Sequence, residues 1–256
     1  MKAVIFCGGK GTRMREETEY RPKPLVLVGG KPILWHIMKL YSHYGIDEFI
    51  LCLGYKGDMI KQYFMEMYWR NNDFTLNING HKEIEYHTVE KEKWKITFVD
   101  TGLETLTGGR LKKIEPYIDE DSFMLTYGDG LSDVNLNQLI NYHNSKGKIA
   151  TLTGVHPISN YGLMEIEDGI VKAFREKPVL KDLVNGGYMV LNKEIFSYLP
   201  SEDCMFEQEP LINLAADTQL TVYEHNGYWT AIDTFKDVES VNKMCENGEI
   251  PWKVWD

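Results

Sequence analysis

The chain has 256 residues, of which 43% are hydrophobic, and this suffices for the core of one large domain. Its formal net charge of −10 argues against nucleic-acid binding, which needs a basic face to neutralise phosphates. No apolar run approaches the length that spans a bilayer, and no signal-peptide pattern opens the sequence, so we expect a cytoplasmic protein without a membrane partner. The four cysteines include no Cys-x-x-Cys pair, which argues against a zinc site and a disulfide framework.

A glycine-rich loop follows the first predicted strand. Residues 2–6 are β-branched and aromatic, which predicts a buried strand of a parallel sheet. Residues 8–13 then read Gly-Gly-Lys-Gly-Thr-Arg, and glycines leave backbone amides open to an anion because they carry no Cβ. Arg13 and Lys23 add two cations, the second between two prolines. The pattern indicates a phosphate-binding loop; the alternative is a turn that only connects strand to helix.

The loop also separates this chain from two large nucleotide-binding classes. A dinucleotide fingerprint would need glycine where Met14 stands, and no P-loop string occurs, so we expect neither a dehydrogenase nor a P-loop NTPase. The string at 8–13 followed by Pro22-Lys23-Pro24 resembles the signature of the sugar-phosphate nucleotidyltransferases. Within that family, Glu16-Glu17-Thr18 resembles the branch of glucose-1-phosphate cytidylyltransferases.

The next elements alternate between helix and strand. Apolar residues at helical spacing over 32–45 and 59–67 predict two helices, and residues 49–53 predict the strand between them. This order is typical of a Rossmann-like, doubly wound α/β sheet whose ligands bind beyond the carboxyl ends of the strands. We therefore expect a mixed sheet with β-hairpin insertions.

The first insertion is expected at about 71–94, where the apolar period changes from helical to alternating. Asn79-Gly80 lies between two alternating runs and is a favoured hairpin turn. The hairpin either covers its own domain as a flap or makes a subunit contact. The resemblance implies a homo-oligomer, namely a hexamer.

A second glycine-containing string follows the strand predicted at 96–99. Thr107 is placed to cap a helix whose glycines leave amides open to an anion, with Arg110 in the first turn. The resemblance implies that Thr105 and Arg110 bind substrate; Arg110 could serve the nucleotide phosphates or a neighbouring subunit's site. A base would be read along residues 101–110 by short polar groups and backbone.

A carboxylate ends the strand predicted at 123–127. Gly128-Asp129-Gly130 lies at the ligand edge of the sheet, where Asp129 can approach a divalent cation. The alternative is a turn aspartate that bonds its own backbone. Asp133 is predicted to cap the helix that follows.

The second half, from about residue 150, is expected to bind the sugar. Asp168-Gly169 predicts the turn of a second hairpin, and Glu176-Lys177-Pro178 at its end resembles the family's sugar-phosphate lysine motif. Asn185-Gly186-Gly187 looks like the start of the family's strand that approaches the sugar ring. Glu207 and its neighbours suit the N-terminus of a helix as dipole partners. Asp233 could cap the next helix, or join Asp129 in holding Mg²⁺ as the resemblance implies.

The resemblance runs along residues 1–256, which we expect to form a single nucleotidyltransferase domain. It implies that the chain transfers a cytidylyl group from CTP to α-D-glucose 1-phosphate by direct in-line attack with Mg²⁺, giving CDP-glucose and pyrophosphate. Arg13, Lys23 and Asp129 are the expected catalytic residues, and Asp129 and Asp233 the metal ligands. The expected substrate-binding residues are Gly8, Gly9, Gly11, Thr12, Thr105, Arg110, Gly128, Glu176, Lys177, Asn185 and Gly186.

Three alternatives stay open: a cytidylyltransferase for another sugar or small phosphate acceptor, a nucleotide-sugar glycosyltransferase, and a non-catalytic nucleotide-binding homologue. A glycosyltransferase would not need both the Pro-Lys-Pro and the Glu-Lys-Pro lysines. The presence of two aspartates and two lysines argues against a binding module.

Overall fold

The computed structural model describes residues 1–78, 82–87, 92–159 and 161–255. A seven-stranded sheet forms its centre, in the order β14-β10-β13-β8-β1-β4-β7. These strands are β1 (Lys2–Phe6), β4 (Glu48–Leu53), β7 (Lys95–Asp100), β8 (Ser122–Tyr127), β10 (Ala150–Val155), β13 (Val184–Asn192) and β14 (Leu220–His225). Within this sheet β13 runs antiparallel to its neighbours β8 and β10, whereas the other pairs are parallel. The sheet is therefore mixed and mostly parallel, as predicted.

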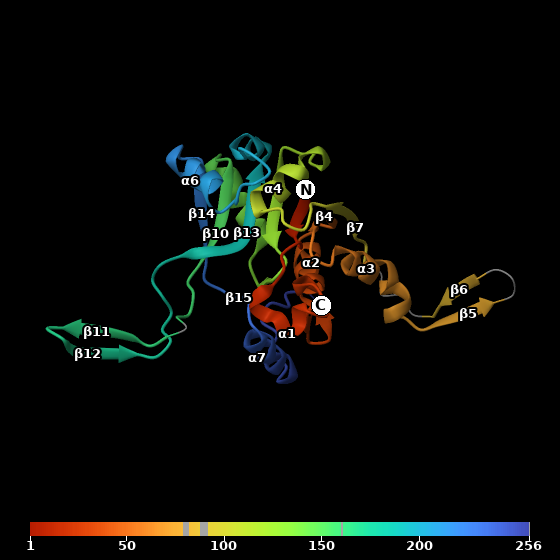
Figure 1. Cartoon of the computed structure of the whole chain (residues 1–256), viewed down its shortest axis with the longest axis horizontal. Helices are drawn as coiled ribbons and strands as arrows, with labels where there is room; N and C mark the ends of the chain where they lie inside the picture. Colours follow the sequence, from red (N-terminus) through yellow and green to blue (C-terminus); the bar gives the residue numbers. More distant parts are fainter. Residues whose placement is uncertain (79–81, 88–91, 160, 256) are drawn as a thin grey trace.

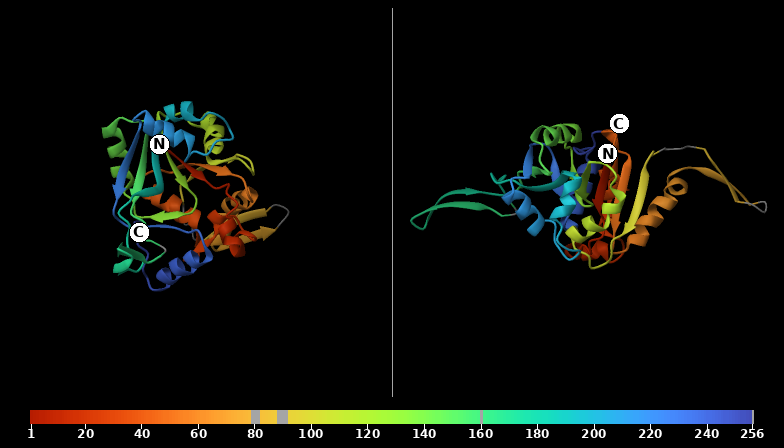
Figure 2. Two further views of the ribbon diagram at one scale, coloured as in Figure 1. Left: turned by 60° about the vertical axis from the view of Figure 1, so that its left-hand side comes forward. Right: turned by 90° about the horizontal axis from the view of Figure 1, so that it is seen from above.

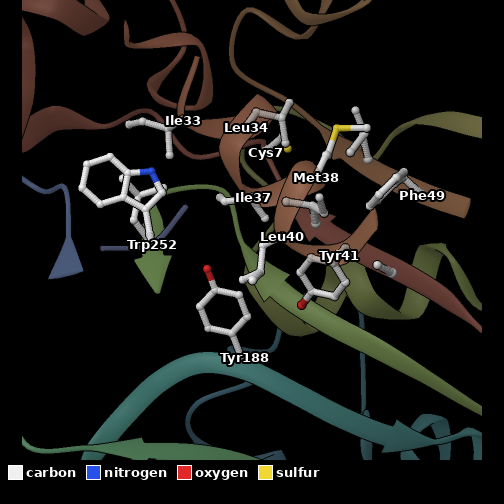
Figure 3. Close-up of a cluster of buried hydrophobic side chains, with 14 of the residues drawn as sticks. Cys7, Ile33, Leu34, Ile37, Met38, Leu40, Tyr41, Phe49, Tyr188 and Trp252 are labelled. Atoms are coloured by element: carbon white, nitrogen blue, oxygen red, sulfur yellow. The ribbon is translucent and has the colours of Figure 1, made fainter. Parts of the chain in front are cut away.

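Alternation along β1 divides the core into two layers. Ala3 and Ile5 belong to one buried cluster, and Val4 and Phe6 belong to the other. Helix α2 (Ile33–His43) packs its apolar face into the first cluster, where Tyr41, Phe49 and Tyr188 meet (Figure 3). Helix α4 (Thr107–Lys113) contributes Leu111 to the second. Helices thus cover both faces of the sheet, which is the doubly wound arrangement.

The remaining helices and short strands complete the body (Figure 1). The helices are α1 (Arg15–Thr18), α3 (Gly57–Asn71), α5 (Leu136–Lys146), α6 (Glu209–Ala216) and α7 (Phe235–Glu246), with 3-10 turns η1 (Thr12–Met14), η2 (Lys23–Leu25), η3 (Glu115–Tyr117) and η4 (Lys193–Tyr198). The short pairs are β2 (Leu27–Val28) with β3 (Lys31–Pro32), and β9 (Gly130–Ser132) with β15 (Trp229–Ala231). Among the described residues, no helix has the length and apolar character that a bilayer crossing needs.

Two hairpins project from opposite sides of the body (Figures 1 and 2). One pairs β5 (Phe74–Ile78) with β6 (Lys82–Tyr86), and the other pairs β11 (Leu163–Glu167) with β12 (Ile170–Arg175). Asp168 and Gly169 have φ angles of 49° and 78°, as the favoured two-residue hairpin turn requires. The turn predicted at Asn79-Gly80 lies outside the described residues.

The hairpins leave apolar side chains exposed. Every residue of β5 is exposed, so the first hairpin does not cover its own domain, and the flap interpretation is wrong. The exposed apolar side chains of the two hairpins are Phe74, Leu76, Ile78, Ile84, Leu163, Met164, Ile166, Ile170, Val171 and Phe174.

Candidate functional site

Two neighbouring cavities lie at the carboxyl ends of β1 and β8. The larger cavity has a volume of about 350 Å³, and its lining includes these residues predicted from the sequence: Gly8, Gly9, Gly11, Thr12, Arg13, Lys23, Thr105, Arg110, Gly128, Asp129 and Asp233. The smaller cavity has a volume of about 230 Å³ and includes Asn185 and Gly186 in its lining. Arg13, Asp129 and Asp233 line both, so the two cavities meet at these charged side chains.

Two carboxylates converge on one ammonium group at this junction. The Lys23 Nζ donates to Asp129 Oδ2 at 2.6 Å and to Asp233 Oδ1 at 2.6 Å. The Arg13 Nη1 donates to the other oxygen of Asp233 at 2.8 Å. The side chains of Asp129 and Asp233 are 31% and 29% exposed, so a ligand in the cavities can reach them.

Asp233 is free for this role because another residue caps the helix after it. Thr234 is the N-cap of α7, and its hydroxyl accepts from the amide of Asp237 in a reciprocal capping box. The Asp237 carboxylate in turn accepts from the amides of Asp233 and Thr234 at 3.0 and 2.7 Å. The capping interpretation of Asp233 is therefore wrong.

The carboxylate pair fits a magnesium ion that has phosphate oxygens as further ligands. Asp129 and Asp233 place oxygens at 2.6 Å from one shared nitrogen, so they can bind one cation together. Within the described ranges, no three His, Cys, Asp or Glu side chains gather as a metal group. Magnesium commonly takes one or two carboxylates and completes its octahedron with substrate phosphates and water.

Arg110 lies beneath the glycine loop. Its guanidinium is buried and donates to the carbonyl of Leu53 at 3.0 Å, the hydroxyl of Thr101 at 2.6 Å and the carbonyl of Gly8 at 3.1 Å. A Cβ at Gly8 would overlap the Arg110 Nη1, so any side chain there would displace the guanidinium from the loop. Burial lowers the pKa of Arg110. These acceptors are neutral groups, so a positive charge sits under the loop and favours an anion above it.

Two helix-capping predictions are wrong. The amides of Gly108 and Gly109 donate to the carbonyl of Cys204 at 3.0 and 3.3 Å, so they are not open to an anion, and Thr107 makes no cap. Asn135, and not Asp133, caps α5. Asp133 instead pairs with His225 at 2.9 Å.

Glu176 and Lys177 are not brought to the site. Both are exposed at the base of the hairpin β11–β12, and neither lines either cavity. Lys177 has a left-handed backbone, with φ at 45°, and the Glu176 carboxylate lies near the backbone of Gly162. The structure therefore places Glu176 and Lys177 beside the hairpin β11–β12 and outside both cavities.

Sequence reasoning missed Tyr127, which lines both cavities. The sequence pattern indicates only the last apolar residue of a strand there, although the position directly before Gly128-Asp129 is a usable signal. Its hydroxyl donates to the carboxylate of Glu207. Trp229 was also missed; it lines the smaller cavity and donates to the carbonyl of Gly186 at 2.7 Å.

The sequence and the fold are similar to those of known proteins. The family model described as nucleotidyl transferase matches residues 2–248. A Bacillus subtilis (strain 168) protein named "Probable glucose-1-phosphate cytidylyltransferase" is 53% identical over 256 residues, covering 100% of both chains. The "Glucose-1-phosphate cytidylyltransferase" of Salmonella typhi is 44% identical over 258 residues, again covering 100% of both. The crystal structure of HddC from Yersinia pseudotuberculosis matches with a TM-score of 0.70 at 23% identity, over 95% of this chain and 99% of that one, which shows a shared fold.

Proposed function

The chain belongs to the nucleotidyl transferase family, and from this premise we propose that it transfers the cytidylyl group of CTP to α-D-glucose 1-phosphate. The products are CDP-glucose and pyrophosphate. Full-length relatives at 53% and 44% identity carry the glucose-1-phosphate cytidylyltransferase name. The observation that carries the proposal is the junction of two cavities at Asp129, Asp233 and Arg13, because a phosphoryl transfer needs two anionic substrates to meet beside neutralising groups.

We assign the larger cavity to the nucleotide. The glycine loop offers amides to the triphosphate, and Thr12 and Arg13 lie at its end. Arg110 supports this loop by donating to the Gly8 carbonyl, and it adds positive charge to the cavity lining. Thr105 lines the same cavity, in the segment assigned to the base.

Lys23 lies at the junction and is assigned to the α-phosphate. Its ammonium lines the larger cavity and donates to both carboxylates at 2.6 Å, so it lies beside a phosphate oxygen that reaches them there. Asp129 and Asp233 would hold a magnesium ion, which would supply charge neutralisation at the transferred phosphoryl group. Arg13 bonds to Asp233 and can hold that carboxylate in place.

We assign the smaller cavity to the sugar. Asn185 lines this cavity, and its side-chain oxygen accepts from the amide of Gly187 at 2.9 Å. Its side chain also hydrogen-bonds to the Tyr127 hydroxyl, so both contacts fix it where it can meet a sugar hydroxyl. Lys177 and Glu176 are assigned to the sugar phosphate only as residues that approach from outside the preformed cavity. The second half of the chain, from about residue 150, thus supplies the sugar side of a single catalytic domain.

The reaction needs no covalent intermediate. Cys7 is the one thiol that lines the larger cavity among the described residues, and burial raises its pKa well above the ordinary value. A neutral thiol is a weak nucleophile. An oxygen of glucose 1-phosphate can instead attack the α-phosphorus of CTP directly, as pyrophosphate leaves in line.

We also propose that the chain forms a homo-oligomer, a hexamer by resemblance. The two projecting hairpins carry exposed apolar side chains on both strands of each, and an isolated two-stranded hairpin is only marginally stable in water. Contact with further copies of the chain would cover these side chains.

Product analysis tests the proposed reaction. The protein is incubated with Mg²⁺, CTP and glucose 1-phosphate, and the products are followed by phosphorus NMR. Equal amounts of pyrophosphate and a CDP-sugar are expected. No turnover of CTP, but release of CDP from added CDP-glucose as its sugar is transferred to an acceptor, would support a glycosyltransferase. CTP binding without any turnover, whatever the acceptor, would support a non-catalytic module.

A further inference from the structure

We propose that Glu207 is a positioning residue that fixes the ring of Tyr127, a side chain that both cavities share. The inference rests on the proposed function, because it assigns Glu207 to the alignment of the two substrates. Glu207 lines neither cavity. It therefore acts through Tyr127 and not by touching a substrate.

Both oxygens of the Glu207 carboxylate hold hydroxyl groups of the cavity lining. One oxygen accepts from the hydroxyl of Tyr127, and the other accepts from the Thr107 Oγ1 at 2.6 Å. The Thr107 hydroxyl also accepts from the amide of Phe206 at 2.9 Å, which ties the same segment to the start of α4. Glu207 thus joins two cavity-lining residues that are far from it in the sequence.

The Tyr127 ring is held between backbone and another ring. Its centroid lies 5.9 Å from that of Phe6. On another side lies Gly187, where a Cβ would be 2.7 Å from the ring carbon Cδ2, so the ring packs directly against the backbone of the strand assigned to the sugar. The phenol hydroxyl donates to Glu207, and the Asn185 side chain hydrogen-bonds to the same hydroxyl, so these two residues fix the phenol end.

The position of this ring bears on the junction of the cavities. Tyr127 is the last residue of β8, and Gly128 and Asp129 follow it directly. A displaced ring would therefore reshape both cavities at once and pull on the backbone that places the Asp129 carboxylate. A misplacement of reacting groups by about 1 Å can cost about 100-fold in rate.

The charge states suit a strong hydrogen bond. The Tyr127 hydroxyl is the donor and the Glu207 carboxylate is the acceptor. A hydroxyl that donates to a carboxylate forms a charge-assisted bond, which is stronger than a neutral one. Helix α6 begins at Glu209, which is the acidic residue in its first turn. Glu207 precedes the N-cap and lies outside that turn, whereas the sequence predicts a dipole role for it.

The experiment compares the full-length wild type with Glu207→Ala, Glu207→Gln, Tyr127→Phe and the double variant Glu207→Ala/Tyr127→Phe. Glu209→Gln is the matched control, because Glu209 is exposed and lies two residues away. Pyrophosphate release is measured with CTP and glucose 1-phosphate. CTP binding is measured by isothermal titration calorimetry, whose stoichiometry counts the folded sites.

We expect Glu207→Ala to lower kcat/KM for glucose 1-phosphate by about 10- to 100-fold, with the CTP stoichiometry unchanged. Glu207→Gln should lose less, because its amide oxygen still accepts from Tyr127. Tyr127→Phe should resemble Glu207→Ala, and the double variant should lie within about 3-fold of the lower single variant, because residues that act as one unit are not additive. Glu209→Gln should match the wild type.

The proposal is overturned if Glu207→Ala keeps the kinetics of the control, or if the two single losses multiply in the double variant. A fall in CTP stoichiometry that parallels the fall in kcat would assign Glu207 a purely structural role. Should Glu207→Ala fail to fold, the comparison of Glu207→Gln with Tyr127→Phe decides by the same criteria.

A wild type that releases no pyrophosphate with any substrate pair would contradict the proposed function and not the positioning role. Crystal structures then carry the test. We expect the Tyr127 ring to be displaced in Glu207→Ala and unmoved in Glu207→Gln. An unmoved ring in Glu207→Ala would contradict the proposal.

Discussion

Asp129 and Asp233 approach the same ammonium group although they follow different strands of the fold. Each is exposed enough to meet a ligand, and together with Arg13 and Lys23 they form the charged junction of the two cavities. Four charges alternate in sign within this cluster, so neutralising any one of them disturbs the other three. Single substitutions of these residues should therefore lower turnover.

We expect Asp129→Asn and Asp233→Asn each to lower kcat by about 100-fold or more, because the metal's charge neutralisation contributes several kcal/mol to such a transition state. Steady-state kinetics over a range of Mg²⁺ concentrations measures the effect, and circular dichroism checks the fold. Asp58→Asn is the matched control, since the Asp58 side chain is 97% exposed on α3. Wild-type turnover in either site variant at low Mg²⁺ would remove that residue from the metal site.

The buried thiols predict a loss of stability at alkaline pH. Burial raises the pKa of Cys52 to about 12, above its ordinary value of 9.0. The folded state therefore binds a proton that the unfolded state releases, and the stabilisation is complete below pH 9 and is lost as the pH rises from 9 toward 12. Between pH 8 and pH 10 this single thiol should account for a fall on the order of 1 kcal/mol in the free energy of unfolding.

Urea denaturation of the wild type and Cys52→Ala at pH 8 and pH 10 measures this contribution. The variant should be less stable at both values because it leaves a cavity, yet its free energy of unfolding should fall less between them. An equal fall in the two proteins would show that Cys52 does not contribute to the pH dependence.

At the scale of elements, the residues that could be predicted for the site are those at the carboxyl ends of strands. The glycine loop, Lys23 and Asp129 follow or approach parallel strands whose carboxyl ends meet at one edge, so the sequence pattern placed them together correctly. Helix starts were harder. Asp133 and Asn135 are both good caps within two residues of each other, and only the packing of Asp133 against His225 decides between them.

Arg110 and Glu207 show what the sequence does not contain. The Thr-Gly-Gly-Arg string does not reveal whether the guanidinium faces the cavity or lies under the glycine loop, because that depends on the carbonyls of Gly8 and Leu53. The pairing of Glu207 with Tyr127 joins segments 80 residues apart. Local patterns carry no information on contacts at that separation.

The hairpin β11–β12 makes a further prediction because Lys177 lies at its base. Lys177→Ala should raise the KM for glucose 1-phosphate by about 10-fold, the loss of one charge-assisted contact, while KM for CTP stays unchanged. Lys172→Ala is the matched control, because Lys172 lies on β12, which ends two residues before Lys177, and pairs with Glu167. Initial rates at varied sugar phosphate measure both. Unchanged KM values in Lys177→Ala would remove Lys177 from the sugar site.

At the scale of the whole molecule, the exposed hairpins predict assembly. Ile166→Asp and Leu76→Asp place a charge among the exposed apolar side chains of the two hairpins, where a contact between copies would bury it at high cost. We expect each variant to have a lower molar mass than the wild type by light scattering after size-exclusion chromatography. Lys172→Ala, which removes no apolar surface, should keep the wild-type mass. A wild type with the mass of a single chain would contradict the proposed homo-oligomer.

The central claim is the pairing of CTP with glucose 1-phosphate, and the most direct measurement is pyrophosphate release with CTP, UTP, dTTP and ATP against the 1-phosphates of glucose, galactose and mannose. Cytosine offers an amine donor where uracil and thymine offer a carbonyl, so a site matched to one leaves buried polar groups unpaired with the other. We predict that CTP with glucose 1-phosphate has the highest kcat/KM, by about 1,000-fold or more over UTP and dTTP. A preference for UTP or dTTP would contradict the account, and activity with CTP but with none of these hexose phosphates would place the error in the acceptor alone.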